Sequence, residues 1–264
     1  PDFDGPRIVT VNGRVDLAVS DLAVGVPGVT IGSRADLLAA GADLPDMDDD
    51  RAHRYVSSRS DAYAALNLMF GTDGAYIDIA AGVTLERPIH VVDVAVPDQI
   101  GTAGSSRTHV RLGAGSSATV VETRISANAG GGGSNVITLI SLDADATLEH
   151  VVVQDLADSQ VHLGRVEVTQ AAGSTFVARS FNTGAAYGRL EYHVRLDGPE
   201  ATADLAGLYL GTDEQVLDQQ ITVVHAAENC VSRQAFRGVL DGKSSGVFNG
   251  GIDVRPGADG TDAS

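Results

Sequence analysis

The sequence predicts an all-β protein: a right-handed parallel β-helix, or β-solenoid, with about 28 residues per coil and short N-terminal helices. Self-similarity at a fixed period is typical of stacked repeat architectures, and no helical period interrupts the strand-like runs. Threonines that follow a small polar corner recur at Thr119, Thr147, Thr175 and Thr202. Apolar markers in the strand before each corner keep almost the same period, at Leu112, Ile140, Val168, Leu196, Val224 and Val254.

Composition agrees with a repetitive, corner-rich fold. The 264 residues can bury a substantial core, which must be built from aliphatic side chains because aromatics are only 5% and Trp is absent. The net charge of −17 argues against nucleic-acid and anionic-membrane binding. The single cysteine, Cys230, excludes an internal disulfide and a cysteine-pair metal site. Together with the lack of a leader or long apolar run, this predicts a cytoplasmic protein.

Residues 1–73 are expected to form strands and helices that pack on the solenoid, and residues 74–264 to form the β-helix core. Within the first part, Asn12 and Gly13 predict a hairpin turn. The segment Ser33–Ala40 predicts a short helix whose first residue is the N-cap and which a glycine follows.

Three further segments carry local predictions. The acidic run Asp43–Arg54 predicts a solvated loop, with a cation site as the alternative. The run Ser60–Phe70 predicts a helix packed on the first coil. Its expected buried stripe consists of Ala62, Ala65, Leu66 and Met69. The glycine-rich segment Asn128–Ser134 predicts a flexible tether between two coils.

The solenoid itself carries two structural expectations. In the strand Thr147–Gln154, Leu148 and Val151 or Val152 cannot all face the interior, so a bulge or bend is expected there. The edge after Val254 is uncovered, and unpaired strands can continue a stack into another chain. We therefore expect this edge to be a docking edge, and the chain to dimerise through it.

Motifs for enzymatic chemistry are sparse. The seven histidines are scattered, none at metal-ligand spacing, and phosphate-binding and nucleophile-elbow motifs are absent. The remaining enzyme hypothesis is a carbohydrate-active β-helix enzyme, a polysaccharide lyase or hydrolase. Against it, the acids fall mainly at corners and the single lysine, Lys243, is isolated.

One pair, His225 and Cys230, has two interpretations. The two residues lie five positions apart at a strand–corner–strand transition, where they could form a nucleophile pair or half of a metal site. In the structural interpretation, Cys230 is a small buried hydrophobe and His225 forms hydrogen bonds at the corner.

The segment from His225 to the C-terminus contains the most specific motif of the chain. Its distinctive positions are His225, Cys230, Ser232, Arg233, Gln234, Gly238, Val247, Phe248, Asn249, Gly250, Ile252, Val254, Thr261 and Asp262. At these positions the chain resembles the SufB/SufD family of iron–sulfur cluster assembly scaffolds, and within it the SufD branch. Weaker similarity extends over nearly the whole chain, and the implied parallel β-helix agrees with the 28-residue period.

The resemblance implies a non-catalytic scaffold that pairs with a SufB-like subunit and a SufC-like ABC ATPase. It implies an iron–sulfur cluster held transiently in the full complex and no cofactor bound stably by this chain. The family's candidate histidine ligand lies in a His-Gly-Ala motif, and no histidine here precedes a glycine. We therefore expect a core fragment whose ATPase site lies in a missing C-terminal part. Cys230 and His225 match the motif, and their role as metal ligands stays open.

Overall fold

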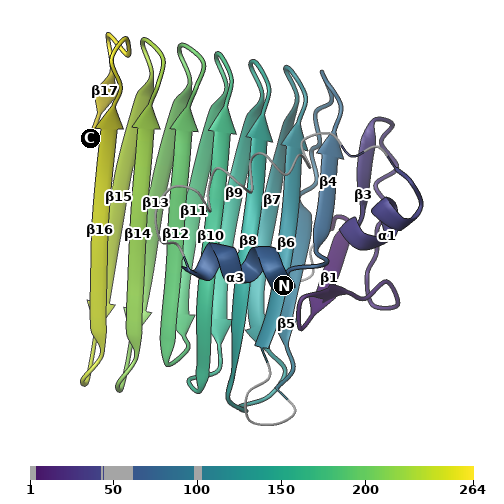
Figure 1. The fold of residues 1–264 in the computed structure, drawn as a ribbon, viewed down its shortest axis with the longest axis vertical. Helices are drawn as coiled ribbons and strands as arrows, with labels where there is room; N and C mark the ends of the chain where they lie inside the picture. The colour runs from purple at the N-terminus through teal and green to yellow at the C-terminus, as the bar shows by residue number, and fades with distance from the viewer. Residues whose placement is uncertain (1–3, 43, 45–61, 98–102) are drawn as a thin grey trace.

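The strands wind into two long sheets that face each other across a shared interior (Figure 1). The structure is a computed structural model that describes residues 4–42, 44, 62–97 and 103–264. Sheet A has the order β17 (Asp262–Ala263), β15 (Val231–Leu240), β13 (Thr202–Gly211), β11 (Thr175–Gly184), β9 (Thr147–Leu156), β7 (Ser117–Ser126), β5 (Ile89–Ala95), β1 (Arg7–Val11) and β2 (Arg14–Val15). Sheet B has the order β16 (Ser245–Val254), β14 (Val216–His225), β12 (Tyr187–Leu196), β10 (Gln160–Gln170), β8 (Gly132–Leu142), β6 (Ala103–Leu112), β4 (Ala75–Ile79) and β3 (Val29–Ser33).

The predicted fold class is confirmed. Strands alternate between the sheets along the chain, and neighbours in each sheet pair in parallel, except β1 with β2 and β3 with β4. The chain thus forms a parallel β-solenoid of about six turns. Strands β1 and β3, from the N-terminal 73 residues, extend the two sheets of the core.

The register of the coils differs in detail from the sequence period. Leu112 pairs with Leu142, and not with the predicted marker Ile140. Thr147 and Thr175 do pair, but the position before them in the stack is Ser117, two residues before the predicted Thr119. Coils therefore vary in length, because the loops at the corners absorb extra residues while the strands stay in step.

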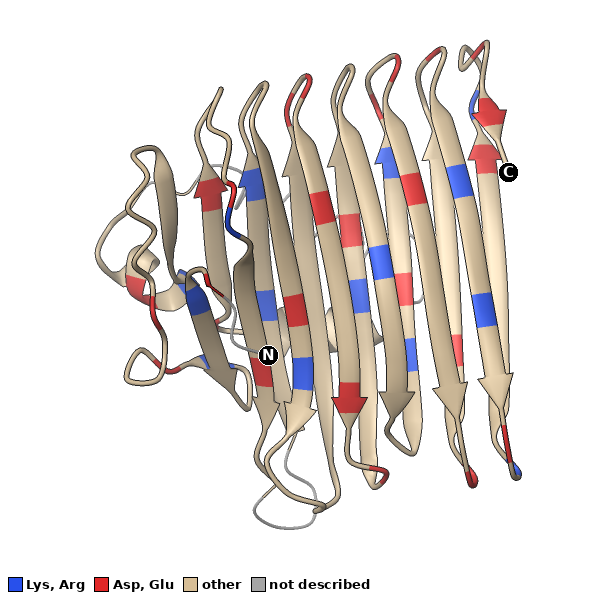
Figure 2. Ribbon diagram, turned by 180° about the vertical axis from the view of Figure 1, so that it is seen from behind, with Lys and Arg blue, Asp and Glu red and all other residues tan. Residues whose placement is uncertain are grey.

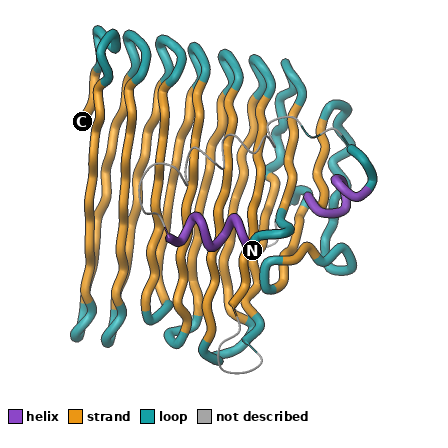
Figure 3. Tube along the Cα trace, in the orientation of Figure 1, coloured by secondary structure: helices purple, strands orange, loops and turns teal. Residues whose placement is uncertain are grey.

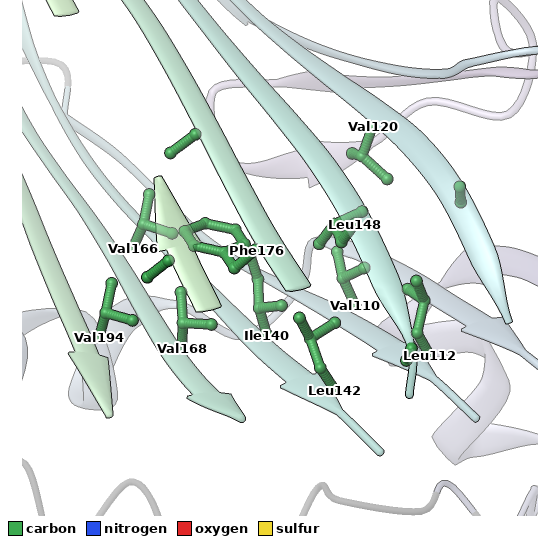
Figure 4. Close-up of a cluster of buried hydrophobic side chains, with 14 of the residues drawn as sticks. Val110, Leu112, Val120, Ile140, Leu142, Leu148, Val166, Val168, Phe176 and Val194 are labelled. Carbon is green, nitrogen blue, oxygen red and sulfur yellow. The ribbon is translucent and has the colours of Figure 1, made fainter. Parts of the chain in front are cut away.

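The interior is apolar near the corners (Figure 4). Rows of inward-facing side chains from successive coils stack on one another, as Val110, Ile140, Val168 and Val194 do in sheet B. Leu148 and Phe176 face them from sheet A and are fully buried. Burial of such aliphatic rows contributes roughly 1.5–3 kcal/mol per large side chain, so the repeated rows hold the stack together.

The bulge predicted within Thr147–Gln154 is wrong. Strand β9 pairs without interruption with both β7 and β11. Inward positions simply alternate, and His150 occupies one of them between Leu148 and Val152. Val152 therefore faces inward with Leu148, and Val151 is only partly buried, so no bulge is needed.

The N-terminal turn and first helix follow the sequence prediction. Asn12 and Gly13 both have positive φ and join β1 to β2. Helix α1 (Arg34–Ala39) begins after Ser33, whose Oγ accepts a hydrogen bond from the Asp36 amide at 3.1 Å. Gly41 follows with φ of +74°. The acidic segment Asp43–Arg54 lies almost wholly outside the described residues.

Helix α3 (Ala62–Phe70) crosses the outer face of sheet B over β6 and β8 (Figure 3). The predicted apolar stripe is wrong, because the buried positions are Ala64 and Asn67. Leu66 and Met69 are exposed by 45% and 71%. No helix among the described residues combines the length and hydrophobicity that spanning a bilayer requires.

Polar contacts fix α3 to the sheet. The Asn67 amide nitrogen donates to the carbonyls of Ser106 and Asn135, each at 2.9 Å, and its oxygen accepts from the Arg107 guanidinium at 3.2 Å. The Asn135 side chain returns a bond to the Tyr63 carbonyl. Asn67 thus joins the helix to two adjacent coils.

The glycine-rich segment is more ordered than a flexible tether. Its last three residues, Gly132–Ser134, belong to β8 and pair with β10. The Asn128 side chain accepts from the Gly130 amide and donates to the Pro97 carbonyl. The turn is therefore held by local hydrogen bonds.

Substitution of Asn67 tests how α3 is held. Asn67→Ala would leave buried backbone carbonyls and Arg107 without this partner, so we expect the free energy of unfolding to fall by about 2 kcal/mol. Leu66→Ala, on the exposed face, should change it by less than about 0.5 kcal/mol. Urea unfolding of both variants measures this, and a larger loss for Leu66→Ala would show that the apolar stripe is the packed face.

Candidate functional site

The last coil, formed by β15 and β16, leaves its inward face open. Phe248, Ile252 and Val254 point to the interior side of β16, yet they are exposed by 48%, 43% and 52%. One coil earlier, Val223 pairs with Ile252 and His225 pairs with Val254, and both of these β14 residues are fully buried. The exposure follows from the absence of a covering coil among the described residues.

The edges of the same coil carry unpaired backbone. Strand β16 has β14 as its one neighbour among the described strands. In sheet A, β17 covers only the start of β15, at Val231 and Ser232. Because the remaining edge N–H and C=O groups face outward, they form a template for another strand.

Electrostatics also distinguish this end. Residues 226–264 carry four basic and five acidic side chains, whereas the whole chain has a net charge of −17. Figure 2 shows acidic positions in corner loops and strands across the rest of the solenoid. An acidic partner that approaches the last coil would therefore be repelled less than one that approaches the rest of the solenoid.

His225 and Cys230 are both fully buried. The His225 Nε2 lies 2.9 Å from the Ser232 Oγ, and the Cys230 thiol donates to the Gly198 carbonyl at 3.3 Å. Burial lowers the pKa of His225 and raises the pKa of Cys230. These environments favour a neutral imidazole and a protonated thiol, which act as corner hydrogen-bonders.

The other motif residues lie on the open coil. Arg233 forms an ion pair with Asp262 on the outer face of sheet A. Asn249 lies on the outer face of sheet B, where its amide nitrogen donates to the Gln220 side chain at 3.0 Å. At Gly250 a Cβ would lie 3.2–3.3 Å from Phe248 and Gln234, so glycine leaves room for both.

The geometry does not assemble a metal centre from these side chains. Among the described residues, no group of three or more His, Cys, Asp or Glu side chains is placed to hold a metal ion. The motif residues share the last two coils, but they face different sides of the strands. The arrangement is that of an exposed cross-section of the solenoid.

A second polar cluster lies inside the solenoid, and the sequence analysis missed it. The Glu122 carboxylate accepts from Arg124 at 2.8 Å and from Thr138 at 2.7 Å, and lies 2.9 Å from the His150 Nε2. Arg124 also donates to the His162 Nε2 at 3.1 Å. Strict alternation along β7 and β9 would have indicated the inward positions of three of them. Glu122 lies two residues after the buried Val120 and Arg124 two residues further on, and His150 lies between Leu148 and Val152.

Glu122 is held ionised despite its burial. Burial alone would raise the pKa of this carboxyl, but the hydrogen bond from His150, the charge of Arg124 and the Thr138 hydroxyl together bring it well below its ordinary value of 4.5. Space for the guanidinium comes from Gly164, where a Cβ would lie 2.5 Å from an Arg124 nitrogen. Buried charges of this kind are stabilised only when fully paired.

Comparison with known proteins places the chain. The family model of the SUF system FeS cluster assembly SufBD core domain matches residues 96–264. The chain belongs to this family. The predicted resemblance is thereby confirmed, including its SufD-like character.

The relatives show how much of a longer protein the chain resembles. It is 25% identical to the iron-sulfur cluster assembly protein SufD of Escherichia coli over 255 residues, which are 96% of this chain and 56% of that protein. A SufBD family protein of Mycobacterium leprae is 30% identical over 128 residues, 46% of this chain and 33% of the relative. One from Mycobacterium tuberculosis is 29% identical over 192 residues, covering 68% and 47%. This SufD-like chain thus spans about half the length of the curated relatives it matches.

The interior ion cluster predicts a pH-dependent stability. Because the folded-state pKa of Glu122 lies below its unfolded value of 4.5, its contribution is present above that pH and is lost as the pH falls through the folded pKa. We expect Glu122→Gln to lower the free energy of unfolding by about 3 kcal/mol at pH 7, and the difference to shrink below pH 4.5. Urea unfolding from pH 7 to pH 3 measures it, with the exposed Glu149→Gln as control. A constant difference would contradict the assignment.

Proposed function

We propose that this protein is a non-catalytic scaffold subunit of a SUF-type iron–sulfur cluster assembly complex, and that its last coil pairs with a SufB-like subunit. The exposed cross-section at β15 and β16 carries this proposal. A SufC-like ABC ATPase belongs to the same complex and binds parts of the full protein outside this core. The iron–sulfur cluster is cargo, held transiently by the assembled complex.

The shape of the open end supports a β-solenoid as partner. Four large inward side chains of the last coil remain uncovered: Leu240, Phe248, Ile252 and Val254. Only a surface with strands at the spacing of both sheets would pair the two edges and cover these side chains together. SufB-like and SufD-like subunits share this fold through the family resemblance. A second copy of the chain offers the same cross-section and is the competing partner.

A chain of hydrogen bonds leads to the edge and constrains that partner. On the outer face of sheet B, Arg189 donates to Asp218 at 2.7 Å, Gln220 donates to Asp218 at 2.6 Å, and Asn249 donates to Gln220. The side-chain amide of Gln220 thus accepts a hydrogen bond from the following coil, and that of Asn249 can accept one from a strand placed beyond β16. The partner strand should place a side-chain N–H donor opposite Asn249, such as an amide or a guanidinium.

We propose structural roles for the buried motif residues. His225 and Cys230 are inaccessible while the last coil is intact, so contact with a cluster would require that coil to open. Their hydrogen bonds to Ser232 and Gly198 instead stabilise the corner before β15. Family membership favours this scaffold role over a carbohydrate-active enzyme.

Edge substitutions in the full-length protein test the pairing. The amides of Ser245 and Arg255 donate to the carbonyls of Gln215 and His225, toward the β14 side. The alternation of parallel strands therefore directs the Ile252 amide to the free edge. Ile252→Pro removes that donor and should weaken binding to the SufB-like protein of the same organism at least about tenfold. Ile252→Val keeps the amide and is the matched control.

The competing outcomes are separable by size-exclusion chromatography with light scattering. Wild-type protein should form a heteromeric complex, and Asn249→Leu should weaken it without dissociating it. Formation of homodimers alone would favour the second copy as partner. Unchanged binding by Ile252→Pro would contradict pairing through β16.

A further inference from the structure

A small polar cavity lies where the N-terminal strand β1 meets the interior of the solenoid. Strands β1, β5, β6, β7, β8 and β10 contribute its polar lining residues. These are Thr10, Asp93, Ser106, Arg124, Ser134 and His162, and Asn12 joins them from the turn after β1. The centre of a water molecule can occupy about 20 Å³ of the cavity, and roughly 10–15 Å³ is enough for one water.

Two buried polar atoms of the lining have no hydrogen-bond partner within the described part of the chain: Asp93 Oδ2 and Arg124 Nε. Both residues are more than nine-tenths buried. The other atoms of these side chains are engaged. Asp93 Oδ1 accepts from Thr10 and Ser106, and the terminal nitrogens of Arg124 donate to Glu122 and His162. Buried polar atoms of this kind are normally paired, often by ordered water.

The hydrogen-bond roles restrict the occupant. Arg124 Nε can only donate, so the occupant must accept a hydrogen bond. His162 accepts from Arg124 at Nε2, which places its proton on Nδ1, 2.7 Å from the Ser134 Oγ. Burial, with the charge of Arg124, lowers the pKa of His162 and keeps this ring neutral. The hydroxyl hydrogen of Ser134 is then free to donate as well.

The protonation state of Asp93 further restricts which small hydrogen-bond acceptor can occupy the cavity. Burial raises the pKa of this carboxyl above its ordinary value, and the charge of Arg124 offsets only part of that effect. The carboxyl can therefore present either an acceptor or an O–H donor. Water matches both forms because it donates and accepts. A halide cannot pair with an ionised Asp93, and the ionised Glu122 already neutralises Arg124. A metal cation cannot accept from Arg124.

We propose that this cavity is a binding site for one ordered water molecule, which accepts from Arg124 Nε–H and hydrogen-bonds to Asp93 Oδ2. Asp93 and Arg124 are paired positions of β5 and β7, and no ion pair joins their side chains among those of the described residues, so the water links the two side chains. Since Thr10 of β1 also bonds to Asp93, the site ties the N-terminal strand to the core. This inference is independent of the proposed function.

Diffraction gives the direct test on the intact chain. We expect a single peak at hydrogen-bond distance, about 2.7–3.2 Å, from both Arg124 Nε and Asp93 Oδ2. Crystals soaked in bromide should show no anomalous signal there. An empty cavity in which Asp93 and Arg124 close into direct contact would overturn the proposal. So would an anomalous peak, which would make the site an anion site.

A solution measurement separates the site from crystal effects. In protein labelled with ¹⁵N-arginine, the Arg124 Nε–H should show a cross-peak to water. Asp93→Leu, which removes one anchor and fills the cavity, should abolish it. Asp78→Leu, on the outer face of sheet B, should leave it unchanged. If Asp93→Leu does not fold, Ser134→Val narrows the cavity and takes its place. Retention of the peak in the cavity-filling variant would contradict the proposal.

Discussion

In-register stacking of parallel strands is the constraint on which the rest of this structure depends. Each coil buries its inward side chains against the coils before and after it. An apolar row such as Val168 and Val194 therefore forms only when the strands of successive coils stay in register. The corner loops can differ in length because the strands alone determine the register. At the last coil the same rule leaves Phe248 and Ile252 uncovered, and this is the surface that we propose a partner covers.

The same stacking makes a polar interior possible. Glu122, Arg124 and His150 come from adjacent strands, and the alternation that orients aliphatic residues inward orients these residues inward as well. Their mutual hydrogen bonds compensate for burial, and the glycine at position 164 makes space for the guanidinium. Toward the N-terminal end the polar groups enclose a cavity, whereas toward the C-terminal end the interior opens to solvent. The two ends of the solenoid therefore differ in chemistry.

The fold class could be predicted from the sequence because stacking imposes a period, and the period is visible. The exact register could not, since Ile140 and Leu142 are equally good apolar markers and only coil-to-coil pairing selects between them. The bulge in β9 was predicted from the three apolar residues of this strand, whereas in the structure Leu148, His150 and Val152 alternate inward without one. The stripe on α3 was predicted from hydrophobicity, but Asn67 hydrogen-bonds the buried backbone carbonyls of Ser106 and Asn135 and so determines the packed face. The last coil could be anticipated as an open edge, whereas the burial of Cys230 and His225 depends on the geometry of a corner.

Amide hydrogen exchange along the stack, measured with and without the SufB-like protein, tests the central claim most directly. Alone, the amides of β15 and β16 should exchange fastest among the long strands, because one edge of each is open. On complex formation these two strands should become protected while β1 and β2 at the opposite end stay unchanged. Protection confined to the N-terminal end, or to α3, with β16 unaffected would contradict the account.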